Sequence, residues 1–144
     1  MQELRLGDQV VRYDRDATVT AYAILKCGDA DRCGCVYCRN FAAQRTSAYP
    51  LEFLSLLDQL GIDVGKEGEV FDMAGPFDLT SRPVGGWFYF VGEFVEAGER
   101  LIQSGEFRYW FQPKFPRPPA CFGERVVAVE FSTVIPWLLK ESAG

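Results

Sequence analysis

The chain has 144 residues, which suits a single domain, and a formal net charge of −5 from 15 Lys and Arg against 20 Asp and Glu. Because its basic residues are scattered through an acidic chain, the composition argues against a nucleic-acid partner. No stretch approaches the roughly 20 apolar residues of a membrane helix, and the polar beginning does not resemble a signal peptide. We therefore expect one cytoplasmic domain over residues 1–144, without a membrane partner.

In chain order, the sequence first predicts two strands and then two helices. Residues 9–13 and 18–26 are rich in β-branched and aromatic residues, and the charged residues between them favour a turn. Residues 38–47, directly after a group of cysteines, are predicted to form a short helix. Residues 50–60 carry Phe and Leu at helical spacing, with a proline at their beginning and a glycine directly after them, and predict a second helix.

The rest of the chain predicts sheet. Short connections that contain Gly and Pro separate the expected strands, which favours an antiparallel meander. The fold class is therefore predicted to be α+β, with an antiparallel sheet of five or six strands, two consecutive helices on one face, and a cysteine-rich loop between strand 2 and helix 1. The later strands are expected at 69–73, 86–95, 107–112 and 125–133.

The strand at 86–95 is expected to be covered on both sides. Trp87 and Tyr89 alternate with Phe88 and Phe90, so both faces of the strand are apolar. The two helices can cover one face. A second sheet layer, a partner subunit in a homodimer or a ligand groove could cover the other, and the sequence does not choose among them.

The strongest chemical signal is a run of four cysteines within twelve residues, out of five in the whole chain. The spacing C-x5-C-x-C-x2-C places four soft sulfur donors within reach of one tetrahedral zinc ion, and four thiolates would close its coordination sphere. This pattern predicts a structural zinc site rather than a catalytic one. Its expected ligands are Cys27, Cys33, Cys35 and Cys38.

The surroundings of the cysteines support this interpretation. Lys26, Arg32 and Arg39 flank them and would offset the negative charge of a zinc tetrathiolate. The chain contains no His, so a mixed Cys and His site is excluded. Should Cys27 not bind, the nearby carboxylates or the distant fifth cysteine could replace it, and these candidates are Asp29, Asp31 and Cys121.

Two other interpretations of the cysteines stay open. In a thiol–disulfide enzyme or redox sensor, Cys35 would attack a disulfide and Cys38 or Cys33 would resolve the intermediate. The predicted order of two helices followed only by strands differs from that of thioredoxin-like folds. The third interpretation is that the cysteines are reduced and simply pack, because free Cys is often buried.

Few other residues suggest chemistry. The lack of His excludes Ser–His and Cys–His pairs, so we predict no catalytic residues. The acidic and basic residues at 66–69 are most simply a charged turn, and the proline-rich segment 113–119 a stiff connection.

The runs Cys33-Gly-Cys-Val-Tyr-Cys-Arg-Asn-Phe41 and Gly85-Gly-Trp-Phe-Tyr-Phe-Val-Gly92 resemble those of a group of uncharacterised small bacterial proteins. This resemblance implies a coherent single domain, and it carries no known activity that would suggest a mechanism. We therefore expect a small binding or interaction protein with a structural zinc site, whose partner is an unknown protein or small ligand.

Overall fold

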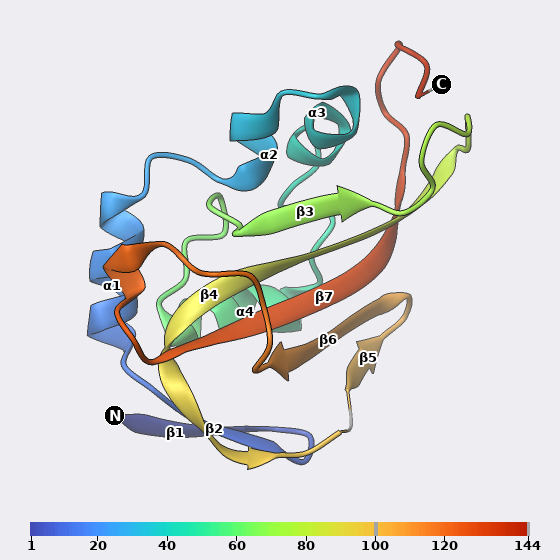
Figure 1. Cartoon of the computed structure of the whole chain (residues 1–144). Helices are drawn as coiled ribbons and strands as arrows, with labels where there is room; N and C mark the ends of the chain where they lie inside the picture. The colour runs from blue at the N-terminus through green and yellow to red at the C-terminus, as the bar shows by residue number, and fades with distance from the viewer. Residues whose placement is uncertain (100, 144) are drawn as a thin grey trace.

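The computed structural model describes residues 1–99 and 101–143, which form a seven-stranded antiparallel sheet with four α-helices (Figure 1). The strand order is β1-β2-β4-β7-β6-β5, and β3 pairs with β4. The α+β class and the antiparallel sheet are thereby confirmed. The strands are β1 (Gln2–Leu6), β2 (Gln9–Tyr13), β3 (Glu69–Asp72), β4 (Ser81–Ala97), β5 (Ile102–Ser104), β6 (Phe107–Gln112) and β7 (Val126–Pro136).

The long strand β4 organises the sheet. One of its edges pairs with β2 near one end and with β3 near the other, while its second edge pairs with β7. The helices come between β2 and β3 in the chain. They are α1 (Arg15–Ile24), α2 (Asp29–Cys33), α3 (Val36–Ala42) and α4 (Leu51–Leu60), and a short 3-10 helix, η1 (Ala120–Phe122), precedes β7.

An aromatic core lies between one face of the sheet and the helices α3 and α4. Phe53 of α4 lies 6.3 Å from Phe88 of β4 and 5.9 Å from Phe131 of β7, measured between ring centroids. Phe41 of α3 stacks on Phe131 at 6.4 Å. These four rings are almost fully buried, and burying each contributes about 1.5–3 kcal/mol to folding, so they fix the two helices on this face.

The opposite face of β4 is covered in part by the segment between β6 and β7. The ring of Tyr89 packs against Phe115 at 5.4 Å and against Phe122 of η1 at 5.7 Å. The hydroxyl of Tyr22, from α1, donates a hydrogen bond of 2.7 Å to the Tyr89 carbonyl. The proline-rich connection therefore supplies cover for the second apolar face that the sequence left open.

The prediction of a strand at 18–26 is wrong, because most of this segment lies in α1. The Asp14 carboxylate accepts a hydrogen bond of 3.0 Å from the Ala17 amide and so caps the helix. The buried positions recur with the period of a helix, and this pattern outweighs the β-branched composition of the segment. These buried residues are Thr18, Ala21 and Tyr22.

The prediction of two helices is also wrong, because the sequence missed α1 and α2, and the helix predicted at 38–47 is α3, which begins and ends earlier. The remaining predicted elements differ from the structure mainly in extent. The bounds of β6 and α4 lie within one residue of the prediction. Strand β4 extends beyond the predicted strand at both ends, and β7 extends beyond it at its C-terminal end. The sequence missed β1 and β5, so the sheet has seven strands and not five or six. Both missed strands are short edge strands with exposed residues, which carry little apolar periodicity. Within the described residues, no helix has the length and apolar character needed to cross a membrane.

Replacing Tyr49 by Phe tests the packing of the core. The Tyr49 hydroxyl is buried among aromatic rings and has no hydrogen-bond partner among the described residues. A buried polar group without a partner costs about 1–3 kcal/mol, so Tyr49→Phe should raise the free energy of unfolding by about 1 kcal/mol in urea denaturation. The matched variant Tyr22→Phe loses the hydrogen bond to Tyr89 and should lower it. A destabilised Tyr49→Phe protein would contradict this account.

Candidate metal centre

Three of the predicted cysteines lie where helix α2 meets helix α3. Cys33 ends α2, Cys35 is the N-cap of α3, and Cys38 lies in the first turn of α3. Gly34 between them has φ +70°, a left-handed conformation that glycine adopts without strain and that turns the chain from one helix into the next. The expected loop between strand 2 and helix 1 is therefore a junction between the second and third helices.

The sulfur atoms of Cys33, Cys35 and Cys38 lie within 4.8 Å of one another. In a tetrahedral zinc site with Zn–S bonds of about 2.3 Å, neighbouring sulfurs lie about 3.8 Å apart. Small rotations about the side-chain bonds would close this difference. The arrangement is thus compatible with a metal ion held by three thiolates.

The thiols of Cys35 and Cys38 differ in exposure and in acidity. Cys38 is buried, whereas Cys33 and Cys35 are exposed. Partial burial opposes ionisation of Cys35, but hydrogen bonds from the Cys38 amide, at 3.4 Å, and from the two neighbouring thiols lower its pKa. For Cys38, burial and the hydrogen bonds that its own thiol donates to Cys33 and Cys35 raise the pKa. Cys35 therefore ionises more readily than Cys38, and solvent can reach it.

Cys27 does not join this group of three sulfurs. It precedes α2, is half-buried, and lines a cavity with residues of α1 and of the proline-rich segment. The alternative carboxylates are already engaged, because Asp29 accepts a hydrogen bond of 3.0 Å from the Val70 amide and Asp31 pairs with Arg45 at 3.2 Å. The fourth coordination position of a metal at the three sulfurs therefore has no evident ligand among these candidates.

A buried carboxylate holds the helical region in place. The side chain of Glu67 is fully buried and receives two hydrogen bonds of 3.0 Å from the guanidinium of Arg45, which follows α3. The same carboxylate accepts a hydrogen bond of 2.9 Å from the Ala30 amide in α2. One side chain thereby ties α2 to the segment after α3, and the cysteines lie between these two points.

The backbone around Glu67 strengthens this attachment. The Glu67 carbonyl accepts a hydrogen bond of 3.0 Å from the Asp29 amide. A Cβ atom on Gly28 would lie 2.5 Å from a Glu67 carboxylate oxygen, so only glycine leaves room at that position. The interpretation of residues 66–69 as a simple charged turn is wrong for Glu67, which the fold needs as a buried acceptor.

The opposite side of α3 is tied to the end of the chain. Arg39 forms two hydrogen bonds with the carboxylate of Glu141, at 2.6 and 2.9 Å. The side chain of Asn40 accepts a hydrogen bond of 2.8 Å from the Leu138 amide and donates one of 3.1 Å to the Pro136 carbonyl. Arg39, predicted to offset the charge of the cysteines, is thus mainly engaged with the C-terminal segment.

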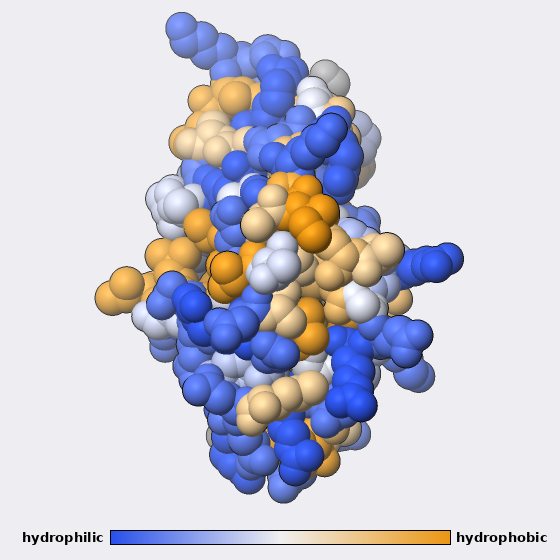
Figure 2. Space-filling model, turned by 90° about the vertical axis from the view of Figure 1, so that its left-hand side faces the viewer, coloured by the Kyte–Doolittle hydropathy of each residue, from blue (hydrophilic) through white to orange (hydrophobic). Residues whose placement is uncertain are grey.

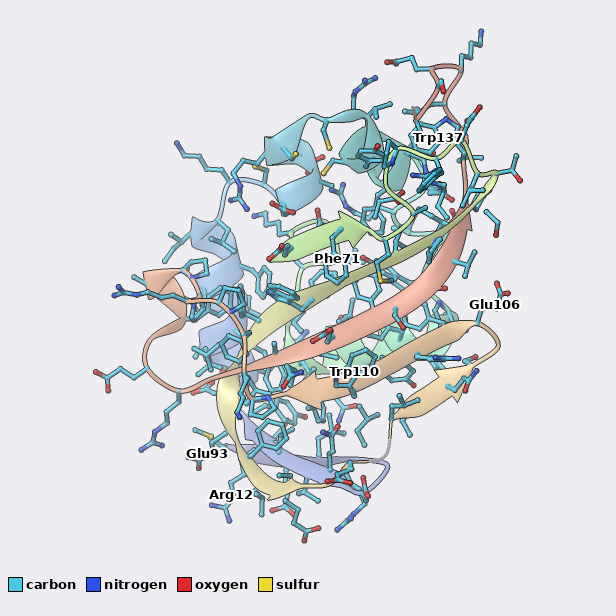
Figure 3. The ribbon with its side chains drawn as sticks, turned by 45° about the vertical axis from the view of Figure 1, so that its right-hand side comes forward. Arg12, Phe71, Glu93, Glu106, Trp110 and Trp137 are labelled. Atoms are coloured by element: carbon cyan, nitrogen blue, oxygen red, sulfur yellow. The ribbon has the colours of Figure 1, made fainter. Side chains whose placement is uncertain are left out.

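A second buried ion pair supports this end of the molecule. The fully buried Arg82 pairs with Asp72 at 3.0 Å, and its guanidinium lies over the rings of Tyr37 in α3 and Trp137, at 5.5 and 5.2 Å from their centroids. Figure 3 shows Trp137 beside α3, where the C-terminal segment passes the helix. Three parts of the chain that are distant in sequence therefore hold α3 and the residues directly after it. They are Glu67, Arg82 of β4 and the C-terminal segment.

No family model, curated protein or solved structure matches this chain. The resemblance to uncharacterised small bacterial proteins stays a prediction.

Replacing Glu67 by Gln should destabilise the protein. The variant leaves the half-buried guanidinium of Arg45 with only Asp31 as an ionic partner, and breaking a buried pair costs about 3–5 kcal/mol. We expect a loss of about 3 kcal/mol in the free energy of unfolding, measured by urea denaturation. The control Glu3→Gln removes an exposed pair with Arg12 and should change little. Equal effects of the two substitutions would contradict the role of Glu67.

Proposed function

We propose that the protein is a small metal-binding protein that holds one zinc ion between helices α2 and α3. The observation that carries this proposal is the approach of three cysteine sulfurs to within 4.8 Å of one another. Thiolates are soft ligands that select zinc over magnesium or calcium. Zinc has no redox chemistry of its own, so its role here would be structural: it would hold the three cysteines, and with them α2 and α3, in a fixed arrangement.

The expected consequence of binding is a rigid junction. Zinc would connect the last residue of α2 with the first turn of α3, two short helices that only Gly34 and Cys35 separate in the chain. Because α3 also contacts the C-terminal segment, the metal would stabilise that segment as well. This effect suits a non-enzymatic binding or interaction protein.

Three cysteine sulfurs lie together, and a tetrahedral zinc ion would need a fourth ligand. Cys33 and Cys35 are exposed, so a water molecule or a group from a partner could reach a metal held by the three sulfurs. A shift of the segment before α2 would be needed for Cys27 to complete the four-cysteine site that the sequence predicts. The substitution Cys27→Ser distinguishes the two arrangements.

Thiol–disulfide exchange is the second candidate, and the contrast between Cys35 and Cys38 favours it. The exposed Cys35 thiolate would attack a substrate disulfide and release one substrate thiolate. The Cys38 thiol would then lose its proton and displace the second substrate thiolate, which leaves the substrate reduced and the two cysteines as a disulfide. The buried position of Cys38, one helical turn from Cys35, suits a resolving residue.

Elemental analysis of the protein purified without chelator tests the zinc proposal. We expect about one zinc per chain, and Cys38→Ser should lose most of it because one of three thiolates is removed. Cys121→Ser is the matched control, since Cys121 lies outside the three-sulfur group, and it should keep its zinc. If the proposal with three ligands is right, Cys27→Ser also keeps zinc.

Three results would overturn or revise this assignment. Protein without metal, together with a Cys35–Cys38 disulfide that dithiothreitol reduces reversibly, would contradict zinc binding and support redox chemistry. Unreactive free thiols without metal would contradict both zinc binding and thiol–disulfide exchange. Loss of zinc in Cys27→Ser would restore the four-cysteine arrangement.

A further inference from the structure

A cavity of about 320 Å³ lies on the side of the molecule where α1, α2 and the proline-rich segment meet. Its volume falls at the lower end of the range for small-molecule pockets. Figure 2 shows this side, with apolar surface gathered across its middle and hydrophilic surface above and below. Cys27 lies in the wall of the cavity, whereas the three-sulfur group is not part of it.

The charge of the cavity wall is positive, in contrast to the net charge of the chain. Three basic side chains line it, Arg32, Lys66 and Arg117, against one acidic residue, Glu67. The Glu67 carboxylate is already neutralised by Arg45. The cavity therefore concentrates positive charge in a protein of net charge −5.

The basic groups differ in how far the protein itself satisfies them. Lys66 donates hydrogen bonds of 2.9 and 2.7 Å to the carbonyls of Tyr22 and Leu25 and pairs with Asp63 at 3.8 Å, which fixes its ammonium group in the wall. Arg32 has one long ion pair, at 3.6 Å, with Asp29. Arg117 has neither an ion pair nor a hydrogen bond within the described part of the chain, so its guanidinium is free to bind an anion.

The remainder of the wall is apolar and held in place. Leu25, Pro118 and the ring of Tyr89 supply apolar surface. The Tyr89 hydroxyl donates a hydrogen bond of 3.2 Å to the Pro116 carbonyl, and Phe122 packs on Tyr22 at 5.2 Å. These contacts hold the proline-rich segment against α1 and β4, so the cavity is formed before a ligand arrives and little ordering opposes binding.

From this combination we infer that the cavity binds a small organic anion, namely a carboxylate attached to an apolar body about the size of one or two fused rings. Arg117 would pair with the carboxylate through two of its N–H groups, with Lys66 and Arg32 adding favourable charge. The apolar body would lie against Leu25, Pro118 and Tyr89. This site is separate from the proposed zinc ion and does not require it.

Titration with 2-naphthoate, followed by amide NMR shifts, tests this inference. We expect a Kd of about 1 mM or tighter, as suits a ligand of this size, with the largest shifts at Cys27 and Gly68 in the cavity wall. Naphthalene-2-carboxamide has nearly the same shape without the charge and should bind at least about fivefold more weakly. Arg117→Gln should weaken naphthoate binding by about fivefold or more.

Two controls complete the experiment. Lys114→Gln removes a positive charge from the same segment but outside the cavity wall, and it should leave the Kd for 2-naphthoate unchanged. Cys38→Ser, which should lose zinc, should still bind naphthoate, so failure of one proposal is distinguishable from failure of the other. Equal binding of acid and amide, shifts away from the cavity, an unchanged Arg117→Gln protein, or equal weakening in Lys114→Gln would each overturn the inference.

Discussion

The placement of α2 and α3 depends on one ion pair, between the buried Glu67 and Arg45. A carboxylate with no exposed surface is tolerated only when its charge is matched and its oxygens accept hydrogen bonds. Glu67 meets both requirements through the guanidinium of Arg45 and the amide of Ala30. Because these partners come from α2 and from the segment after α3, the pair sets how the two helices are placed, and with them the cysteines.

Helix α3 has only seven residues and would be unstable alone, so its position comes from its attachments. Glu67 and Arg45 hold one side, while the C-terminal segment and Arg82 hold the other. A metal at the three sulfurs would add a further attachment at the first turn of the helix. Since burial raises the pKa of the Cys38 thiol, binding of zinc there would release a proton, and the proposed affinity for zinc would rise with pH.

The sequence predicted well the elements whose apolar pattern is strong. Helix α4 shows Phe and Leu at helical spacing between a proline and a glycine, and β6 alternates buried and exposed residues. The prediction for α1 failed because the β-branched and aromatic residues of this segment suggested a strand. The capping residue Asp14 was nevertheless present in the sequence as a helix signal. Local composition misled where the cap and the burial pattern decided the structure.

The site was predictable in part. The close spacing of Cys33, Cys35 and Cys38 was enough to indicate that their sulfurs could meet. The position of Cys27 depends on where the fold places α1 and α2, and the spacing of the cysteines carries no information about that placement. The buried role of Glu67 depends on Arg45, 22 residues earlier in the chain, and no local pattern reveals such a pair. Side chains that act through distant partners were thus the ones that sequence reasoning missed.

The most direct test of the central claim is X-ray absorption spectroscopy at the zinc edge of the purified, zinc-loaded protein. The three-cysteine site predicts three sulfur neighbours at about 2.3 Å and one lighter oxygen or nitrogen neighbour at about 2.0 Å. A coordination shell with fewer than three sulfurs would show that zinc does not bind between α2 and α3 as described, and would contradict the account.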